Sequence, residues 1–285
     1  MAAATGRDRP WPAPAKLNLF LHVTGRRADG YHDLQTVFQL LDRGDELHFG
    51  VRDDGRIRRR RPLAGVADAH DLCLRAARLL QTATGARHGA DIELVKRLPL
   101  GGGLGGGSSD AATTLVALNA LWGTGLRPDE LATLGRRLGA DVPVFVHGRS
   151  AWAEGVGERL TPLTLAPRWY LVLFPECHVA TAEIFDAPEL TRDSKPITIP
   201  DFLAGRTRND CEAVVAARYP QVAEALRQLA RAGRMSGTGA CVFAAFDDAA
   251  AARRALPAGW RGLVARGVDR SPLLDRLEAQ RSGAA

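Results

Sequence analysis

The chain has 285 residues, more than a usual single domain, so its length predicts two domains. Hydrophobic residues make up 46% and charged residues 25%, as in ordinary soluble proteins, and no apolar stretch is long enough to cross a membrane. The net charge of +6 suits a small anionic substrate, whereas the basic run Arg56–Arg61 has no interleaved aromatics, so we expect a solvated loop there and no nucleic-acid partner.

The first half of the chain starts with strands and continues with helices. Apolar runs separated by polar turns predict strands over residues 17–23, 34–41 and 46–51. A helix with apolar residues at helical spacing follows over residues 71–83, and a strand over 90–98. Two further helices are expected over residues 109–122 and 128–138.

The second half alternates strands and helices after a change of composition near Pro167. Strands are predicted over residues 169–174, 241–246 and 262–266. Helices are predicted over residues 209–218, 220–232 and 247–256. The whole pattern indicates the α+β class, with helices packed against an antiparallel sheet and with domains at residues 1–165 and 166–285.

Six glycines and two serines stand between a predicted strand and a predicted helix, in the segment Pro99-Leu-Gly-Gly-Gly-Leu-Gly-Gly-Gly-Ser-Ser109. Glycines let backbone N–H groups approach an anion closely, and the start of a helix adds unpaired N–H groups and a positive dipole end. We therefore expect a phosphate cradle. A flexible Gly/Ser linker is the alternative, but a linker would not stand between a strand and a helix.

Two common phosphate-binding loops do not fit this segment. The Walker pattern requires a lysine directly after the glycines, and none follows them here. A dinucleotide fingerprint is formally present at Gly101, Gly103 and Gly106, but a Rossmann unit needs a second parallel strand ending in an acidic residue about 20 positions later. That region instead leads into another helix, which disfavours an NAD-dependent dehydrogenase.

Cysteine and lysine usage narrows the possible chemistry. Cys73, Cys177, Cys211 and Cys241 are far apart and form no metal-binding pattern, so we expect buried thiols and no metal held by the protein. The amino terminus lacks the apolar core of a secretory signal, which predicts a cytoplasmic protein with no membrane partner. Only three of the 38 basic residues are lysines, so a lysine inside a motif suggests a specific role.

Several segments resemble the GHMP kinase superfamily, in which such a glycine-rich loop binds ATP. Besides that loop they are Pro14-Ala-Lys-Leu-Asn-Leu-Phe-Leu, Arg27-Ala-Asp-Gly-Tyr-His32, Leu138-Gly-Ala-Asp-Val-Pro-Val-Phe145, Ala153-Glu-Gly-Val-Gly-Glu158, Asn209-Asp-Cys-Glu and Ser236-Gly-Thr-Gly-Ala-Cys241. The resemblance runs from about Pro14 to Leu273. It implies an N-terminal, ATP-binding domain like ribosomal protein S5, a C-terminal ferredoxin-like α/β sandwich, and an active site between them.

The resemblance also implies a reaction, transfer of the γ-phosphoryl group of ATP with Mg²⁺ to the 2-hydroxyl of a diphosphocytidyl methylerythritol, in non-mevalonate isoprenoid precursor synthesis. Asp141 matches the family's base and Lys16 the cation beside it. A tertiary alcohol is a poor nucleophile, so a carboxylate that accepts its proton is useful. Taken singly, Asp141 would serve as a helix cap and Lys16 as a surface lysine; their matching motifs favour the catalytic roles.

The resemblance also implies which residues bind the nucleotide and the substrate. For the nucleotide they are Lys96, Pro99, Leu100, Gly101, Gly102, Gly103, Leu104, Gly105, Gly106, Gly107, Ser108 and Ser109. For the substrate they are Asn18, Tyr31, His32, Thr181 and Phe185, since a planar base needs aromatic faces and hydrogen bonds at its edge. Asp71 stands where other members commonly carry an asparagine that helps to hold adenine, so purine recognition at this position is left open.

The resemblance leaves alternatives within and outside the superfamily. A mevalonate-type or homoserine-type kinase would share the glycine-rich loop but lack the Gly30-Tyr-His32 segment. A nucleotide-binding protein without catalysis would not require both Lys16 and Asp141. We expect a monomer or a weak homodimer with a small-molecule substrate.

Overall fold

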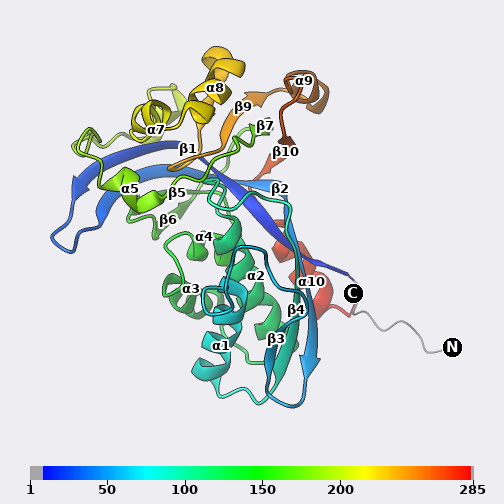
Figure 1. The fold of residues 1–285 in the computed structure, drawn as a ribbon. Coiled ribbons are helices and arrows are strands. Elements are labelled where there is room, and N and C mark those ends of the chain that lie inside the picture. Colours follow the sequence, from blue (N-terminus) through cyan, green and yellow to red (C-terminus); the bar gives the residue numbers. More distant parts are fainter. Residues whose placement is uncertain (1–8, 284–285) are drawn as a thin grey trace.

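Two long antiparallel strands, β1 (Trp11–Arg26) and β2 (His32–Arg52), organise the computed structural model, which describes residues 9–283 (Figure 1). The other edge of β2 is shared by three strands in succession. These are β5 (Ala151–Gly155), β10 (Gly262–Val268) and β4 (Gly89–Val95). Because β2 pairs with strands from both halves of the chain, one sheet runs through the molecule.

The described residues form a ten-stranded sheet with the central order β3-β4-β2-β10-β7-β9-β8, to which β1, β5 and β6 are attached. The remaining strands are β3 (Ile57–Arg59), β6 (Arg159–Pro162), β7 (Trp169–Leu173), β8 (Arg234–Met235) and β9 (Val242–Phe246). The helices are α1 (Leu72–Thr84), α2 (Gly106–Leu121), α3 (Pro128–Arg136), α4 (Val142–His147), α5 (Thr181–Phe185), α6 (Ile199–Leu203), α7 (Glu212–Arg218), α8 (Pro220–Gln228), α9 (Ala249–Arg254) and α10 (Pro272–Arg281). Most strand pairs are antiparallel, and the expected α+β class is confirmed.

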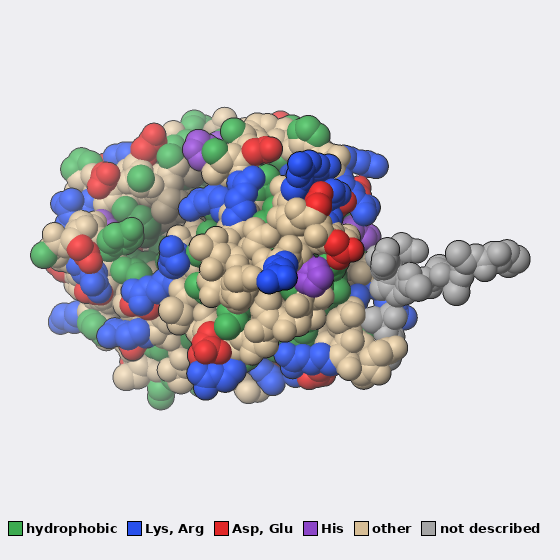
Figure 2. All heavy atoms as spheres, turned by 90° about the horizontal axis from the view of Figure 1, so that it is seen from below, with side chains coloured by type: hydrophobic (Ala, Val, Ile, Leu, Met, Phe, Trp, Pro, Cys, Tyr) green, Lys and Arg blue, Asp and Glu red, His purple; other side chains and the backbone are tan. Residues whose placement is uncertain are grey.

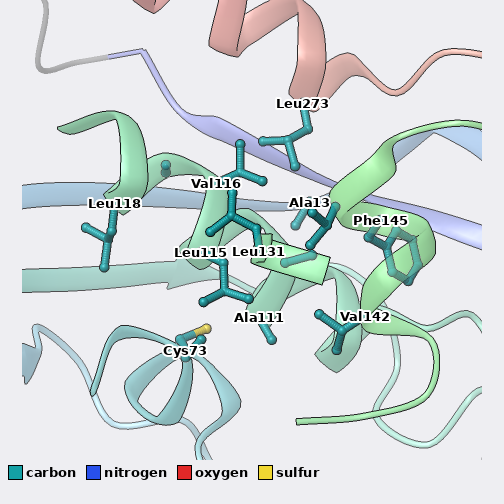
Figure 3. Packing of buried hydrophobic residues seen from close by; sticks show 14 of the residues in the cluster. Ala13, Cys73, Ala111, Leu115, Val116, Leu118, Leu131, Val142, Phe145 and Leu273 are labelled. Atoms are coloured by element: carbon teal, nitrogen blue, oxygen red, sulfur yellow. The ribbon is translucent and has the colours of Figure 1, made fainter. Parts of the chain in front are cut away.

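Helix α2 lies at the centre of the first hydrophobic core, which it forms with α1, α3, α4 and the strands behind them (Figures 1 and 3). Its residues are buried on nearly every side, polar ones such as Thr113 and Thr114 included, because other elements surround the helix. Leu115 and Leu118 are fully buried there. Leu273 of α10 packs into the same core, so the last helix of the chain covers the N-terminal half.

A second core joins β7 and β9 to helices α5, α7 and α8. Leu171 and Val242 are fully buried on the sheet, opposite Val215 and Val222 of the two helices. The burial of such side chains stabilises this layer by roughly 1.5–3 kcal/mol each. The result is a helix layer on the upper part of the sheet in Figure 1, separate from the layer around α2.

The main departure from the predicted elements lies in β2. The prediction divided it into two strands at the polar segment 42–45, but the strand is continuous. Gly44 allows this, because a Cβ there would stand 2.0 Å from the carbonyl oxygen of Ala13 on β1. Helix α2 begins at Gly106 rather than Ser109, and the short helices α4, α5 and α6 and the final helix α10 were not predicted.

The basic run Arg56–Arg61 is also more ordered than predicted. Residues 57–59 form β3, which pairs in parallel with β4. The guanidinium of Arg59 is 5% exposed and lies 2.9 Å from the Asp71 carboxylate, whose other oxygen caps the start of α1 by accepting from the N–H groups of Cys73 and Leu74. The expectation of a solvated loop is therefore wrong for Arg59.

The surface and the cysteines can be compared with what the composition predicted about membrane spans, charge and thiols. No helix within residues 9–283 has the length and apolarity needed to span a membrane. Basic and acidic side chains are interspersed on the face shown in Figure 2. Cys73, Cys211 and Cys241 are buried as predicted, and burial raises the pKa of Cys73 and Cys211 to about 12, whereas Cys177 is only partly buried.

Candidate active site

A cleft of about 420 Å³ opens where β1, the glycine-rich loop, α5 and the β8–β9 loop meet. Its lining comes from segments spread over most of the chain. The lining residues are Lys16, Asn18, Leu21, Leu34, Leu72, Lys96, Pro99, Leu100, Gly101, Gly102, Gly103, Gly105, Gly106, Gly107, Ser108, Ala140, Asp141, Val156, Thr181, Phe185, Gly237, Thr238 and Gly239. Most of the residues that the sequence predicted for the site thus lie around one cleft.

The glycine-rich loop leads from β4 into the first turn of α2. Gly103 and Gly105 have φ angles of +72° and +69°, which residues with a side chain rarely adopt. At Gly103 a Cβ would also stand 2.1 Å from the carbonyl oxygen of Ser236. The loop therefore needs glycine for both conformation and space, and it directs the start of the 16-residue helix α2 at the cleft.

The β8–β9 loop fixes the shape of the glycine-rich loop from the opposite side. The Ser236 hydroxyl donates to the carbonyl of Gly103 at 2.9 Å, and the Cys241 N–H donates to the carbonyl of Gly102 at 3.1 Å. The Asn209 side chain in turn donates to the carbonyls of Met235 and Gly237. A loop from the second half of the chain thus supports the glycine-rich loop, which the glycine motif alone does not reveal.

Lys16 and Asp141 form an ion pair at the floor of the cleft, with Nζ of Lys16 3.2 Å from Oδ2 of Asp141. The ammonium, 4% exposed, also donates to the carbonyl of Gly103 at 3.0 Å and to the side chain of Asn18. Asp141 precedes α4, but its side chain makes no capping hydrogen bond. Its carboxylate is 30% exposed at the cleft. The geometry therefore favours the pairing with Lys16 over the capping alternative.

Lys96 lies at the other side of the α2 start, between two buried carboxylates. Its Nζ is 2.7 Å from Asp45 and 2.8 Å from Asp110. Burial by itself would lower the pKa of Lys96, but the two carboxylates outweigh it and the pKa is raised. Burial raises the pKa of Asp110 to about 7, against the opposing effect of the Lys96 ammonium. Neither carboxylate was predicted for the site: Asp45 is remote from the glycine-rich segment, and Asp110 directly follows Ser109 but its contact with Lys96 is seen only in the folded chain.

The far end of the cleft contains aromatic side chains. The rings of His32 and Phe185 are stacked, with centroids 5.1 Å apart and planes at 17°. Phe185 lines the cleft, and Tyr31 is 65% exposed at the tip of the β1–β2 turn. The hydroxyls of Thr181 and Thr238 lie 3.0 Å apart and link α5 to the β8–β9 loop.

Four of the predicted residues do not line the cleft. Leu104 is buried in the core beneath the loop, and Ser109 is buried with its hydroxyl unpartnered among the described residues. His32 stacks on the lining residue Phe185 without lining the cleft itself, and Tyr31 is exposed at the β1–β2 turn. Conversely, several lining residues were not predicted, although all of them except Leu34 and Leu72 belong to the motifs quoted above: Leu21, Leu34, Leu72, Ala140, Val156 and the Gly237–Gly239 segment.

The oxygen-bearing side chains at the cleft determine how it could hold Mg²⁺. Residues 9–283 contain no cluster of three His, Cys, Asp or Glu side chains able to hold a metal ion. The cleft offers the Asp141 carboxylate, already paired with Lys16, and the Ser108 hydroxyl. These residues fit a Mg²⁺ that is held mainly by nucleotide phosphates, with few protein ligands, as is usual for this ion.

Two family models match parts of the chain that contribute to this cleft. The model for the GHMP kinases N terminal domain matches residues 71–149, and the model for the GHMP kinases C terminal domain matches residues 198–262. The mevalonate kinase of Methanococcus jannaschii shares the fold, with a TM-score of 0.63 at 16% identity over 90% of this chain and 96% of that one. The fold and the site thus define a small-molecule kinase of the GHMP type.

Within that type, one kinase is similar over nearly the whole chain. The 4-diphosphocytidyl-2-C-methyl-D-erythritol kinase of Alkalilimnicola ehrlichii is 64% identical over 97% of both chains, and that of Halorhodospira halophila 61% identical over 96% of this chain and 98% of its own. A crystal structure of 4-(cytidine 5'-diphospho)-2C-methyl-D-erythritol kinase has a TM-score of 0.78 at 36% identity, covering 91% of this chain and 99% of that one. The chain therefore belongs to the 4-diphosphocytidyl-2-C-methyl-D-erythritol kinase family of GHMP kinases.

Proposed function

We propose that this kinase transfers the γ-phosphoryl group of ATP to the 2-hydroxyl of 4-diphosphocytidyl-2-C-methyl-D-erythritol, in non-mevalonate isoprenoid precursor synthesis. The observation that carries the proposal is the Lys16–Asp141 ion pair, 3.2 Å long, beside a phosphate cradle. A cradle alone would bind a nucleotide without chemistry. A carboxylate facing the cleft next to it supplies a group that can accept the proton of an acceptor alcohol.

In the proposed mechanism Asp141 is the base. Its carboxylate receives the hydroxyl proton while the alcohol oxygen forms a bond to the γ-phosphorus and the bond to the ADP oxygen breaks. Because phosphoryl transfer has a loose transition state, most of the catalysis comes from positioning and charge stabilisation, and the base assists the final bond formation.

Lys16 has two tasks in this scheme. Its ammonium pairs with Asp141 and would so hold the carboxylate in place at the cleft. It also donates to the carbonyl of Gly103, which fixes the distance between the base and the phosphate cradle. Asn18 accepts from the same ammonium and would orient it.

At the nucleotide end, the backbone N–H groups of residues 101–107 and the start of α2 would hold the triphosphate. Lys96, held by Asp45 and Asp110, would add a positive charge near the phosphates. Mg²⁺, when bound with the nucleotide, neutralises charge on the phosphate oxygens, and the Ser108 hydroxyl is the protein group placed to contribute one ligand.

At the acceptor end, Tyr31 and Phe185 would stack on the cytosine ring, with His32 at its edge. Aromatic rings suit this task because every base has a π-face, and stacking contributes roughly 1–3 kcal/mol per base. Thr181 would contact the diphosphate or sugar part of the substrate, since it lines the cleft between Phe185 and the β8–β9 loop.

The division of the chain at about residue 165 belongs to the same proposal. Cleft residues come from before and after this point, as a site between two domains requires. Helix α10 packs in the first core, so it would belong to the C-terminal unit by its place in the sequence but to the N-terminal unit by its contacts. Limited proteolysis near residue 165 tests the boundary.

A coupled assay of ADP release tests the function, with purified protein, ATP, Mg²⁺ and a panel of acceptors. We expect rapid turnover of the diphosphocytidyl substrate and little of homoserine, mevalonate or free methylerythritol. Brisk turnover of homoserine or mevalonate with none of the diphosphocytidyl substrate would refute the proposal. ATP binding without turnover of any acceptor would instead indicate a nucleotide-binding protein.

A further inference from the structure

Arg192 ties the aromatic end of the cleft together with all three nitrogens of its guanidinium. Nη2 donates to the carbonyls of Phe185 and Ala187, each at 2.7 Å, and Nη1 donates to the carbonyl of Leu190 at 3.1 Å. Nε donates to Nε2 of His32 at 3.2 Å. One planar side chain thus connects the segment after α5 to the start of β2, which are 160 residues apart in the chain.

The bond to His32 has a consequence for the imidazole. A guanidinium has only donors, so Nε2 of His32 must offer a lone pair, and in a neutral ring the proton then resides on Nδ1. Burial, followed by the positive charges of Arg192 and Arg26, lowers the pKa of His32 against the effect of Asp186, so the ring is neutral near pH 7. The opposite tautomer would place two N–H groups against each other.

The Nδ1–H group of His32 remains available for a ligand. Among the described residues no side chain or carbonyl accepts from it. Nδ1 is also not one of the polar atoms that are fully buried without a hydrogen-bond partner. The imidazole plane is fixed by its stacking on Phe185, a cleft residue. A donor in a fixed plane beside a stacking residue is suited to the acceptor edge of a pyrimidine.

We infer that Arg192 is a positioning residue for substrate specificity, which holds His32 in the Nδ1–H tautomer so that it donates to an acceptor atom of the cytosine ring. This inference rests on the proposed function for the identity of the ligand, but the tautomer itself is a property of the free protein. Cytosine offers acceptors at N3 and O2, whereas uracil carries a proton on N3. Arg192 thereby contributes to recognition of the base without contacting it.

The first experiment observes the tautomer in the full-length, ligand-free protein. Long-range ¹H–¹⁵N correlation of the histidine rings, with His32 assigned from a His32→Phe variant, should show a protonated Nδ1 and a free Nε2. In Arg192→Met the signal should shift toward the Nε2–H form. An unchanged tautomer in a folded Arg192→Met protein would overturn the inference, whether or not the proposed substrate is correct.

The second experiment measures kinetics with the diphosphocytidyl substrate. Arg192→Met should raise KM for this substrate about tenfold, the effect of one hydrogen bond, with kcat and the KM for ATP within twofold. Arg192→Lys retains a donor and should recover part of the loss. In a His32→Phe background, which keeps the aromatic ring, Arg192→Met should cause almost no further increase.

A matched control separates positioning from simple anchoring of the segment. Arg218 holds the same segment from outside, through Glu189 at 2.7 Å and the carbonyl of Glu183, and makes no bond to His32. Arg218→Met should leave KM within twofold. Equal increases in Arg192→Met and Arg218→Met would mean that both arginines act only by anchoring, and would refute the role in base reading.

Discussion

The two ends of the cleft, which we propose bind the nucleotide and the acceptor, differ in how the chain builds them. The nucleotide end is dominated by backbone: one continuous segment, residues 99–109, turns directly into α2. The acceptor end is dominated by side chains from separate segments, with Tyr31 and His32 on one side and Phe185 with Arg192 on the other. Lys16 and Asp141 lie where the two ends meet.

This difference suggests that the two ends tolerate change differently. A backbone cradle depends on conformation and close packing, so a single added methyl group harms folding and nucleotide binding together. A side-chain platform depends on faces and hydrogen bonds, so its variants should fold and bind ATP but lose affinity for the acceptor. Variants at the junction should retain both ligands and lose the chemistry.

The largest effect is expected at the junction. Asp141→Asn keeps the size of the side chain but removes the base, so kcat should fall by about 10²–10⁴-fold. Nucleotide affinity, measured by calorimetry, should change by less than threefold. Asp129→Asn, at a side chain that is 86% exposed on α3, is the control and should behave as wild type. Retention of more than a tenth of the wild-type kcat in Asp141→Asn would exclude Asp141 as the base.

The next effect tests the backbone end. In Gly103→Ala the new Cβ would stand 2.1 Å from the carbonyl of Ser236, in addition to the strain of a positive φ, so unfolding free energy should fall by about 3 kcal/mol or more. Gly123→Ala has the same kind of φ, +65°, but open space around its Cβ, and should lose only about 1 kcal/mol. Denaturant unfolding compares the two. Equal losses would show that the contact with Ser236 does not shape the cradle.

A smaller effect tests the side-chain end. Tyr31→Ala removes an exposed aromatic face and should raise KM for the diphosphocytidyl substrate about tenfold, while the KM for ATP stays within twofold. Tyr31→Phe keeps the face and should stay near wild type. If Tyr31→Phe loses as much as Tyr31→Ala, the hydroxyl rather than the ring contributes, and the stacking proposal fails.

The smallest effect concerns the carboxylates behind Lys96. The pKa of Asp110 in the folded protein, about 7, lies above its ordinary value of 3.8, so the folded state binds more protons than the unfolded state between these values. The stability from this group is therefore present below about pH 4 and lost as pH rises through 7. Asp110→Asn should lack this loss, so its unfolding free energy should gain relative to that of wild type as pH rises from 4 to 7. Parallel pH profiles for Asp110→Asn, Asp129→Asn and wild type would contradict this.

The sequence predicted those features that depend on neighbouring residues. The strands and helices with clear periodicity, among them α1, α3, β7 and β9, lie within a few residues of the predicted bounds. The α+β class and the kinase family are confirmed as well. The catalytic, nucleotide and substrate roles of individual residues stay predictions, although most of those residues lie around one cleft.

The features that were missed depend on contacts between distant segments. The polar stretch at residues 42–45 looked like a turn, yet it continues a strand because Gly44 packs against Ala13 and Asp45 binds Lys96. Arg59 looked solvated but pairs with buried Asp71. Local periodicity carries no information about such partners, since a charge is expected at the surface until its counter-charge is known.

By itself, the sequence of this protein determined a glycine-rich loop at the start of a helix, an arrangement suited to an anion, because it lies within one short segment. Only the tertiary structure decided what surrounds this loop. It brought the loop after Ser236 onto Gly103, the Lys16 ammonium between Gly103 and Asp141, and Arg192 onto His32. The physical reason is that a backbone cradle is a local conformation, whereas ion pairs and tautomers depend on the nearest atoms in space.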